Sequence, residues 1–206
     1  MNWPWTPKDK LASGLLQSDV SLPPYSVDGK DSAAVPFAQP VEPIKPDALV
    51  KLANLGYWDK RKAVNMTLEA AILALHHSWN VNYTQGGSRW EAIERGYKAW
   101  RGQYPHWADC SSFVTWCLWN GLDHFHMPDV VNHQNWRGGY TRTMLMSGWR
   151  VSSPLPGDAV IYGSGWPGEH TALYTGGGLV VSHGGPGVHL LPMRYRNDVL
   201  AIRRYI

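Results

Sequence analysis

Apolar and polar positions follow two different patterns along the chain. Between residues 47 and 147 the apolar residues recur at three- and four-residue spacing, which predicts amphipathic helices. Caps and stops are expected where Ser, Thr or Asp precedes such a stretch and Gly follows it. The predicted helices are 47–55 ending at Gly56, 68–79 capped by Thr67, Ser88 to about Trp100, a helix capped by Asp109 and stopped by Gly121, and 141–147.

The last 50 residues contain short β-prone runs separated by glycine and proline. This pattern is typical of an antiparallel meander, here of about five strands. Because the helices come first and the strands second, we predict an α+β domain in which helices pack on a C-terminal sheet. The expected strands are 159–162, 171–174, 179–182, 188–191 and 199–202.

Residues 1–46 hold eight of the fifteen prolines and show little apolar periodicity. Such a segment cannot readily build a core of its own and should run extended. We therefore predict an N-terminal arm over 1–46, docked on the domain or on another protein, and a single domain over 47–206.

Composition narrows the classes of function. The 206 residues are 44% hydrophobic and 17% charged, and 19 Lys and Arg face 16 Asp and Glu with no run of five basic residues. A dedicated nucleic-acid binder would concentrate its basic residues in a patch. The sequence also lacks an 18-residue apolar stretch and an apolar region near Met1, so we expect neither a membrane span nor a secretory signal.

The two cysteines lie in one predicted helix. Cys110 and Cys117 are seven residues apart, which is about 10 Å along a helix, too far for a disulfide. Cys110 falls on the first turn, where free amide groups favour a thiolate and should lower its pKa. Cys117 shares a face with Phe113 and is expected to be buried. For Cys110 alone, nucleophilic catalysis and inert burial both stay open.

A nucleophilic thiol also needs a base and a group that orients the base. His170 opens one predicted strand and His183 follows the next. Residues at the start of one antiparallel strand and the end of its neighbour lie side by side, so we expect the two imidazoles to touch. The other histidine cluster, His124, His126 and His133, matches no zinc-ligand spacing, and we predict no metal and no cofactor.

These motifs resemble the NlpC-type cell-wall cysteine peptidases, which have a papain-like fold. The hallmark of that family is Asp-Cys-Ser-Gly-Phe/Leu-Val at a helix start, a Pro-Gly-Asp strand, His-Val-Ala-Ile-Tyr-x-Gly and a polar residue on the next strand. The resemblance covers about Thr67 to Ile206, and Ser112 and Thr171 depart from the family pattern. The matching segments are Asp109–Val114, Pro156–Tyr162, His170–Gly176 and Val180–Gly184.

The resemblance implies Cys110 as nucleophile, His170 as general base and acid, and His183 as the orienting third residue. Within Val81–Gly87, which is similar to the family's Tyr-x-x-Gly-Gly segment, Tyr83 is implied to bind the oxyanion together with the Cys110 backbone N–H. Three further residues are expected to bind substrate beside this centre: Ser111, Trp107 and Trp166.

The implied reaction is amide hydrolysis through a thioester, in the stem peptide of peptidoglycan. Without an expected secretory signal, a bacteriophage lysin or virion-tail protein that reaches the cell wall is the favoured setting. Two alternatives stay open. One is a CHAP-type amidase, and the other is a structural tail component that uses a peptidase-like fold for assembly, with its arm docked on a tail protein.

Overall fold

The computed structural model describes residues 54–206. The predicted arm and all but the end of the predicted helix 47–55 lie outside the described residues. No helix within residues 54–206 has the length and apolar character needed to cross a bilayer.

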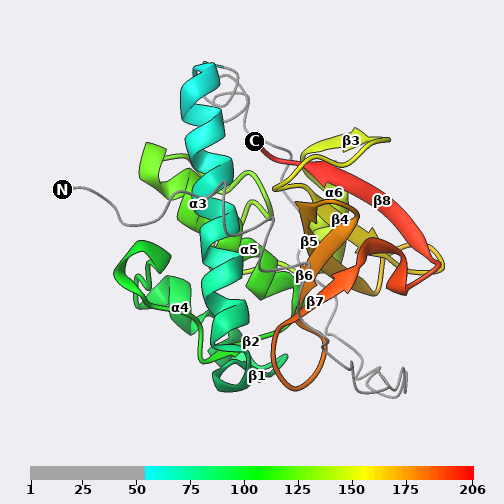
Figure 1. The fold of residues 1–206 in the computed structure, drawn as a ribbon, viewed down its shortest axis with the longest axis horizontal. Coiled ribbons are helices and arrows are strands. Elements are labelled where there is room, and N and C mark those ends of the chain that lie inside the picture. The colour runs from blue at the N-terminus through cyan, green and yellow to red at the C-terminus, as the bar shows by residue number, and fades with distance from the viewer. Residues whose placement is uncertain (1–53) are drawn as a thin grey trace. The chain divides into compact units, whose positions relative to one another are not determined.

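Two helices crossing at close range form the first layer (Figure 1). Helix α3 runs unbroken over Tyr57–His76, and α5 covers Cys110–Leu122. The prediction that Thr67 caps a helix is wrong, because Thr67 lies inside α3 and donates its hydroxyl to Ala63 O at 2.9 Å. The buried face of α3 consists of small side chains, which lets α5 approach its backbone: Ala63, Thr67, Ala70, Ala71 and Ala74.

Gly121 belongs to this helix crossing and does not stop α5, contrary to the sequence prediction. The helix continues to Leu122. A Cβ atom on Gly121 would lie 2.3 Å from Ala63 O and 2.4 Å from Thr67 Oγ1, so only glycine fits between the two helices.

The predicted helix from Ser88 to Trp100 is also wrong. The structure has a 3₁₀ turn at Gly87–Trp90, a single helical turn α4 at Glu91–Glu94 and another 3₁₀ turn at Ala99–Arg101, without a side-chain cap at the start. Gly96 interrupts the segment with φ 69°, a left-handed conformation that a continuing helix cannot contain. Two short strands flank this region and pair in parallel, β1 (Asn82–Tyr83) and β2 (Trp107–Ala108).

The second layer is a six-stranded antiparallel sheet in the order β3-β8-β4-β5-β6-β7. Strands β4 to β7 form the predicted meander, and β8 returns to pair with β4 on its other side. The α+β class is therefore confirmed, with one strand more than expected, because the three-residue β3 is too short to stand out as a pattern. The strands are β3 Trp149–Val151, β4 Ala159–Tyr162, β5 His170–Gly176, β6 Leu179–Ser182, β7 His189–Pro192 and β8 Val199–Arg204.

Helix α5 lies between α3 and the sheet, and all thirteen of its residues are buried. It packs on the sheet face that carries Ile161, Leu173 and Val181, and the short helix α6 (Thr141–Met146) joins the same core through Met144. Alternate residues of the same strands form a smaller cluster on the opposite face, as period-two alternation requires. The start of α5 and the start of β5 thus lie together beside this core.

We predict that Gly121→Ala destabilises the protein by about 1–3 kcal/mol, although alanine is the better helix former, because the added methyl overlaps the Ala63 carbonyl. Chemical denaturation measures the loss. Gly87→Ala is the matched control, because a Cβ there meets nothing within 4 Å. An unchanged free energy of unfolding for Gly121→Ala would refute this account of the helix crossing.

Candidate active site

Asp109 fixes the first turn of α5, as the sequence predicts. Its Oδ1 accepts hydrogen bonds from the Ser112 backbone N–H at 2.7 Å and from the Ser111 hydroxyl at 2.9 Å. In return, the Ser112 hydroxyl accepts from the Asp109 N–H at 2.8 Å, which completes a capping box. Ser112, which replaces the family's glycine, is therefore buried and serves the cap.

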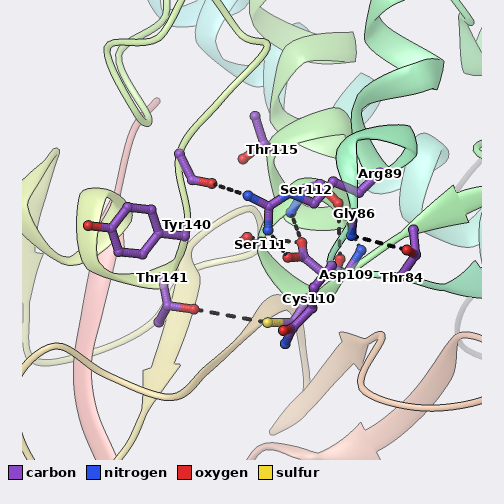
Figure 2. Close-up of polar contacts among 12 residues, drawn as sticks. Thr84, Gly86, Arg89, Asp109, Cys110, Ser111, Ser112, Thr115, Tyr140 and Thr141 are labelled. Carbon is purple, nitrogen blue, oxygen red and sulfur yellow. Dashed lines mark hydrogen bonds and ion pairs between the residues drawn. The ribbon is translucent and has the colours of Figure 1, made fainter. Parts of the chain in front are cut away.

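Arg89 joins this cap to two other segments (Figure 2). Its guanidinium forms an ion pair with Asp109 Oδ2 and also donates to Gly139 O at 3.2 Å. The 3₁₀ turn that carries Arg89, the start of α5 and the loop before α6 are held together by this one side chain. Sequence reasoning missed Arg89, because a pairing over twenty residues has no local signature.

The Cys110 thiol is enclosed by neighbouring segments, and the residue is 7% exposed. Its sulfur faces the Thr141 hydroxyl (Figure 2), and Sγ and Oγ1 are 4.0 Å apart. Burial, assisted by the negative charge of Asp109, raises the pKa of the thiol to about 12, although the Thr171 and Ser111 backbone N–H groups act in the opposite direction. The prediction of a lowered thiol pKa is therefore wrong for this state, because desolvation outweighs the helix start.

His170 is the first residue of β5 and is also buried. Its Nε2 lies 2.7 Å from Ser182 Oγ, and Ser182 Oγ lies 3.5 Å from the Tyr195 hydroxyl. Burial first, and then the positive charge of Arg196, lowers the pKa of His170 to about 4. Thiol and imidazole are therefore both uncharged at neutral pH. The bond between Cys110 Sγ and the N–H of Thr171, which follows His170, brings these two elements together.

His183 does not contact His170 in the way the sequence predicts. Its Nδ1 lies 2.7 Å from Gly187 O and its Nε2 lies 3.3 Å from Asn82 O, so both ring nitrogens face backbone carbonyls. Ala172 is the register partner of Ser182, which places Ser182 on the face that His170 shares, whereas His183 points to the other face. The register therefore makes Ser182, and not His183, the partner of His170.

Ser182 was missed because the choice between two adjacent residues depends on strand register. His183 instead packs its ring against the rings of Tyr83 and Phe113, with centroids 5.5 and 6.2 Å apart. Burial lowers the pKa of His183 as well. The structure thus gives His183 a place between α5 and the β1 segment.

The other predicted site residues lie in two groups. Tyr83 in β1 pairs with Ala108, which puts Tyr83 close to the chain entering Cys110, and Gln85 donates to the Tyr83 hydroxyl at 3.2 Å. Ser111 is buried with its hydroxyl engaged by Asp109, and Trp107 is 41% exposed on β2. Trp166 lies apart from these three, 58% exposed in the loop before His170.

No metal-binding group of three His, Cys, Asp or Glu side chains occurs among residues 54–206. His124 instead lies 2.9 Å from Lys62 Nζ, and His133 Nε2 is buried without a partner. The groups described at the start of α5 and of β5 are a thiol, an imidazole and hydrogen-bond donors.

Comparison with known proteins identifies a family to which the sequence is similar. A family model described as NlpC/P60 family matches residues 95–201, which is more than half of the chain. No curated protein matches the chain significantly.

Several solved structures resemble this one at low sequence identity. RipB, a peptidoglycan hydrolase from Mycobacterium tuberculosis, is 21% identical with a TM-score of 0.49, covering 76% of this chain and 71% of RipB. The NlpC/p60 domain of the peptidoglycan hydrolase SagA is 18% identical with a TM-score of 0.45, covering 68% and 98%. NlpC1 from Trichomonas vaginalis is 20% identical with a TM-score of 0.44, and the match spans 74% of this chain but 46% of NlpC1.

The family match covers the segment with Cys110 at the start of α5 and His170 at the start of β5. The chain belongs to the NlpC/P60 family, whose members are cysteine peptidases that act on peptidoglycan.

Proposed function

We propose that the protein is an endopeptidase that hydrolyses an amide bond in the stem peptide of peptidoglycan, with Cys110 as nucleophile and His170 as general base and acid. The observation that carries the proposal is the bond that joins the two segments carrying the buried Cys110 and the buried His170. The thiol on the first turn of α5 bonds the N–H of Thr171, next to His170, whose Nε2 is held by Ser182 at 2.7 Å. Membership of the NlpC/P60 family supports the substrate class.

In the first step, the proton of the Cys110 thiol passes to His170 while the sulfur attacks the substrate carbonyl carbon. Because Nε2 faces Ser182 Oγ, Nδ1 is the ring nitrogen that takes this proton, and Nε2–H then donates to Ser182. The carbonyl oxygen becomes an oxyanion, which the Cys110 backbone N–H and the Tyr83 hydroxyl stabilise.

The second half of the reaction returns the enzyme to its starting state. His170 gives its proton to the leaving amine as the C–N bond breaks, which leaves a thioester on Cys110. Water then attacks the thioester carbonyl and His170 accepts the proton of the water. When the C–S bond breaks, His170 gives this proton to the sulfur, which restores the thiol and the neutral imidazole. One water is consumed, and one carboxyl and one amine are formed.

Ser182 acts in this scheme as a positioning residue. A hydroxyl carries no charge, so it fixes the ring of His170 and its tautomer without stabilising an imidazolium by Coulomb attraction. This differs from a carboxylate partner, which would raise the pKa of the imidazole. The low pKa of His170, about 4, agrees with an uncharged partner in a buried site.

Delivery by a bacteriophage tail or lysis system, and docking of the arm 1–46 on a tail protein, stay predictions of the sequence. The described residues 54–206 do not bear on either. The new termini in digested peptidoglycan separate an endopeptidase from an amidase of the CHAP type.

The decisive experiment is digestion of purified peptidoglycan by wild-type protein and by Cys110→Ala. We expect the variant to lose at least about 10³-fold in rate, because the nucleophile is removed. Cys117→Ala is the matched control, since Cys117 is buried on the same helix, and it should keep its activity despite some loss of stability. Mass spectrometry should show a new amino terminus inside the stem peptide. Hydrolysis by Cys110→Ala at the wild-type rate would sink the mechanism.

We predict that Ser182→Ala lowers kcat by about 3- to 10-fold, the value of one lost hydrogen bond, with little change in Tm. Ser182→Thr, which keeps the hydroxyl, should recover most of the rate. His183→Asn should instead lower Tm, because His183 fills a buried space and bonds Gly187 O, and should leave kcat within about 3-fold of wild type in folded protein. A large loss of kcat in His183→Asn, with kcat unchanged in Ser182→Ala, would instead make His183 the third member of the triad.

The uncharged resting pair predicts a specific pH dependence. His170 is a free base above its pKa of about 4, so kcat/KM should stay level on the acid side until the pH falls through about 4. The thiol pKa of about 12 predicts that alkylation of Cys110 by iodoacetamide, followed by peptide mass spectrometry, keeps rising with pH beyond pH 9. A plateau in the alkylation rate below pH 7 would show a resting thiolate instead.

A further inference from the structure

Two adjoining grooves of about 390 and 520 Å³ run beside α6 and along β3 and β8. They share Arg150 and Leu200, so they form one continuous surface, which we call the β3–β8 groove. The larger groove follows β3 and β8. The smaller groove, beside α6, is lined by Leu145, Met146, Arg150, Trp166, Leu200 and Arg203.

No carboxylate of residues 54–206 balances the positive charge in this groove. Arg150 on β3 and Arg203 on β8 are direct register partners, and like charges directly opposite each other on neighbouring strands repel. Neither guanidinium makes an ion pair with any residue of 54–206. Arg150 donates only a long bond, 3.4 Å, to Leu200 O, and Arg203 Nε is buried without a partner.

Two other arginines, Arg204 and Arg196, have carboxylate partners. Arg204, the neighbour of Arg203, donates to both oxygens of the buried Asp158 at 2.8 and 2.7 Å. Arg196 pairs with Asp198 and Glu169. Among residues 54–206, Arg150 and Arg203 have no carboxylate of this kind, although they lie directly opposite each other on neighbouring strands.

Arg142 and Trp166 extend the same surface toward the catalytic centre. The Arg142 guanidinium lies 4.8 Å from the centre of the Trp166 ring, and its Nε also has no partner. The preceding residue, Thr141, is the one whose Oγ1 contacts the Cys110 sulfur. Trp166 belongs to the loop that leads into His170. The groove thus begins next to the segments that enclose the proposed nucleophile and base.

We propose that the β3–β8 groove binds free carboxylates of the peptidoglycan stem peptides, with the paired guanidinium groups of Arg150 and Arg203 as the anion site and Trp166 as an apolar wall. This inference rests on the proposed function. Guanidinium groups match carboxylates in shape and charge, and a bound carboxylate removes the repulsion between the two arginines. A peptidoglycan strand bound at Cys110 carries such carboxylates on the peptide itself and on its neighbours, so the groove holds substrate outside the cleaved bond.

The binding test uses the full chain with Cys110→Ala, so that the substrate stays intact, and measures sedimentation with insoluble peptidoglycan. Arg150→Gln/Arg203→Gln should weaken binding about 10-fold or more. Arg61→Gln/Arg101→Gln removes the same net charge from exposed positions elsewhere and should change binding less than 2-fold. Peptidoglycan whose carboxyl groups have been converted to amides should bind both double variants and the parent equally weakly.

Three results would overturn the proposal. If both double variants weaken binding equally, the effect is one of overall charge. If Arg150→Gln/Arg203→Gln binds peptidoglycan as tightly as the parent, the groove does not take part in binding. Displacement of the protein by a glycerol-phosphate polymer, but not by soluble stem peptides, would assign the groove to a phosphodiester ligand.

Kinetics separate this proposal from the proposed function. In an otherwise wild-type chain, Arg150→Gln/Arg203→Gln should raise KM for native peptidoglycan about 10-fold and leave kcat unchanged. An unchanged KM would refute carboxylate binding in the groove and leave the proposed hydrolysis standing. If the wild-type chain binds peptidoglycan through these arginines but releases no fragments, the proposed hydrolysis is refuted and binding in the groove stands.

Discussion

The carboxylate of Asp109 fixes the geometry on which the candidate site depends. One oxygen accepts hydrogen bonds from the Ser112 N–H and the Ser111 hydroxyl at the start of α5. The other oxygen pairs with Arg89, whose guanidinium also donates to Gly139 O. Cys110 follows immediately, so the position of its sulfur is set by a cap, an ion pair and a loop contact together. The same negative charge opposes a thiolate on Cys110 and helps to raise the pKa of its thiol.

Burial decides the resting state of the proposed catalytic pair. The helix start favours a thiolate, yet the enclosed position of Cys110 raises the thiol pKa, and enclosure lowers the pKa of His170. Both groups are therefore uncharged at rest. In the proposed mechanism, negative charge would develop beside the Cys110 backbone N–H, and a hydrogen-bond donor acts strongly where water is excluded.

The arginines of the described residues differ in whether a carboxylate pairs with them. Arg89 and Arg204 are paired with the buried carboxylates of Asp109 and Asp158, and these pairs tie together segments far apart in sequence. A buried pair of this kind stabilises the fold mainly because removing one partner leaves an uncompensated charge. Arg150 and Arg203 lack such partners among the described residues and face each other across β3 and β8. Because these two positive charges have no counter-ion among the described residues, they are available to an anionic ligand.

The sequence by itself determined the α+β class, five of the six sheet strands to within about two residues at each end, the Asp109 cap and the two groups proposed to react, because these depend on local periodicity, capping and motif spacing. It did not determine that Gly121 lies at a helix crossing, that Ser182 and not His183 meets His170, or that the Cys110 thiol is protonated. Those outcomes depend on which segments approach each other, on strand register and on the removal of water. Only the tertiary structure decides them, because each arises between residues that are distant along the chain.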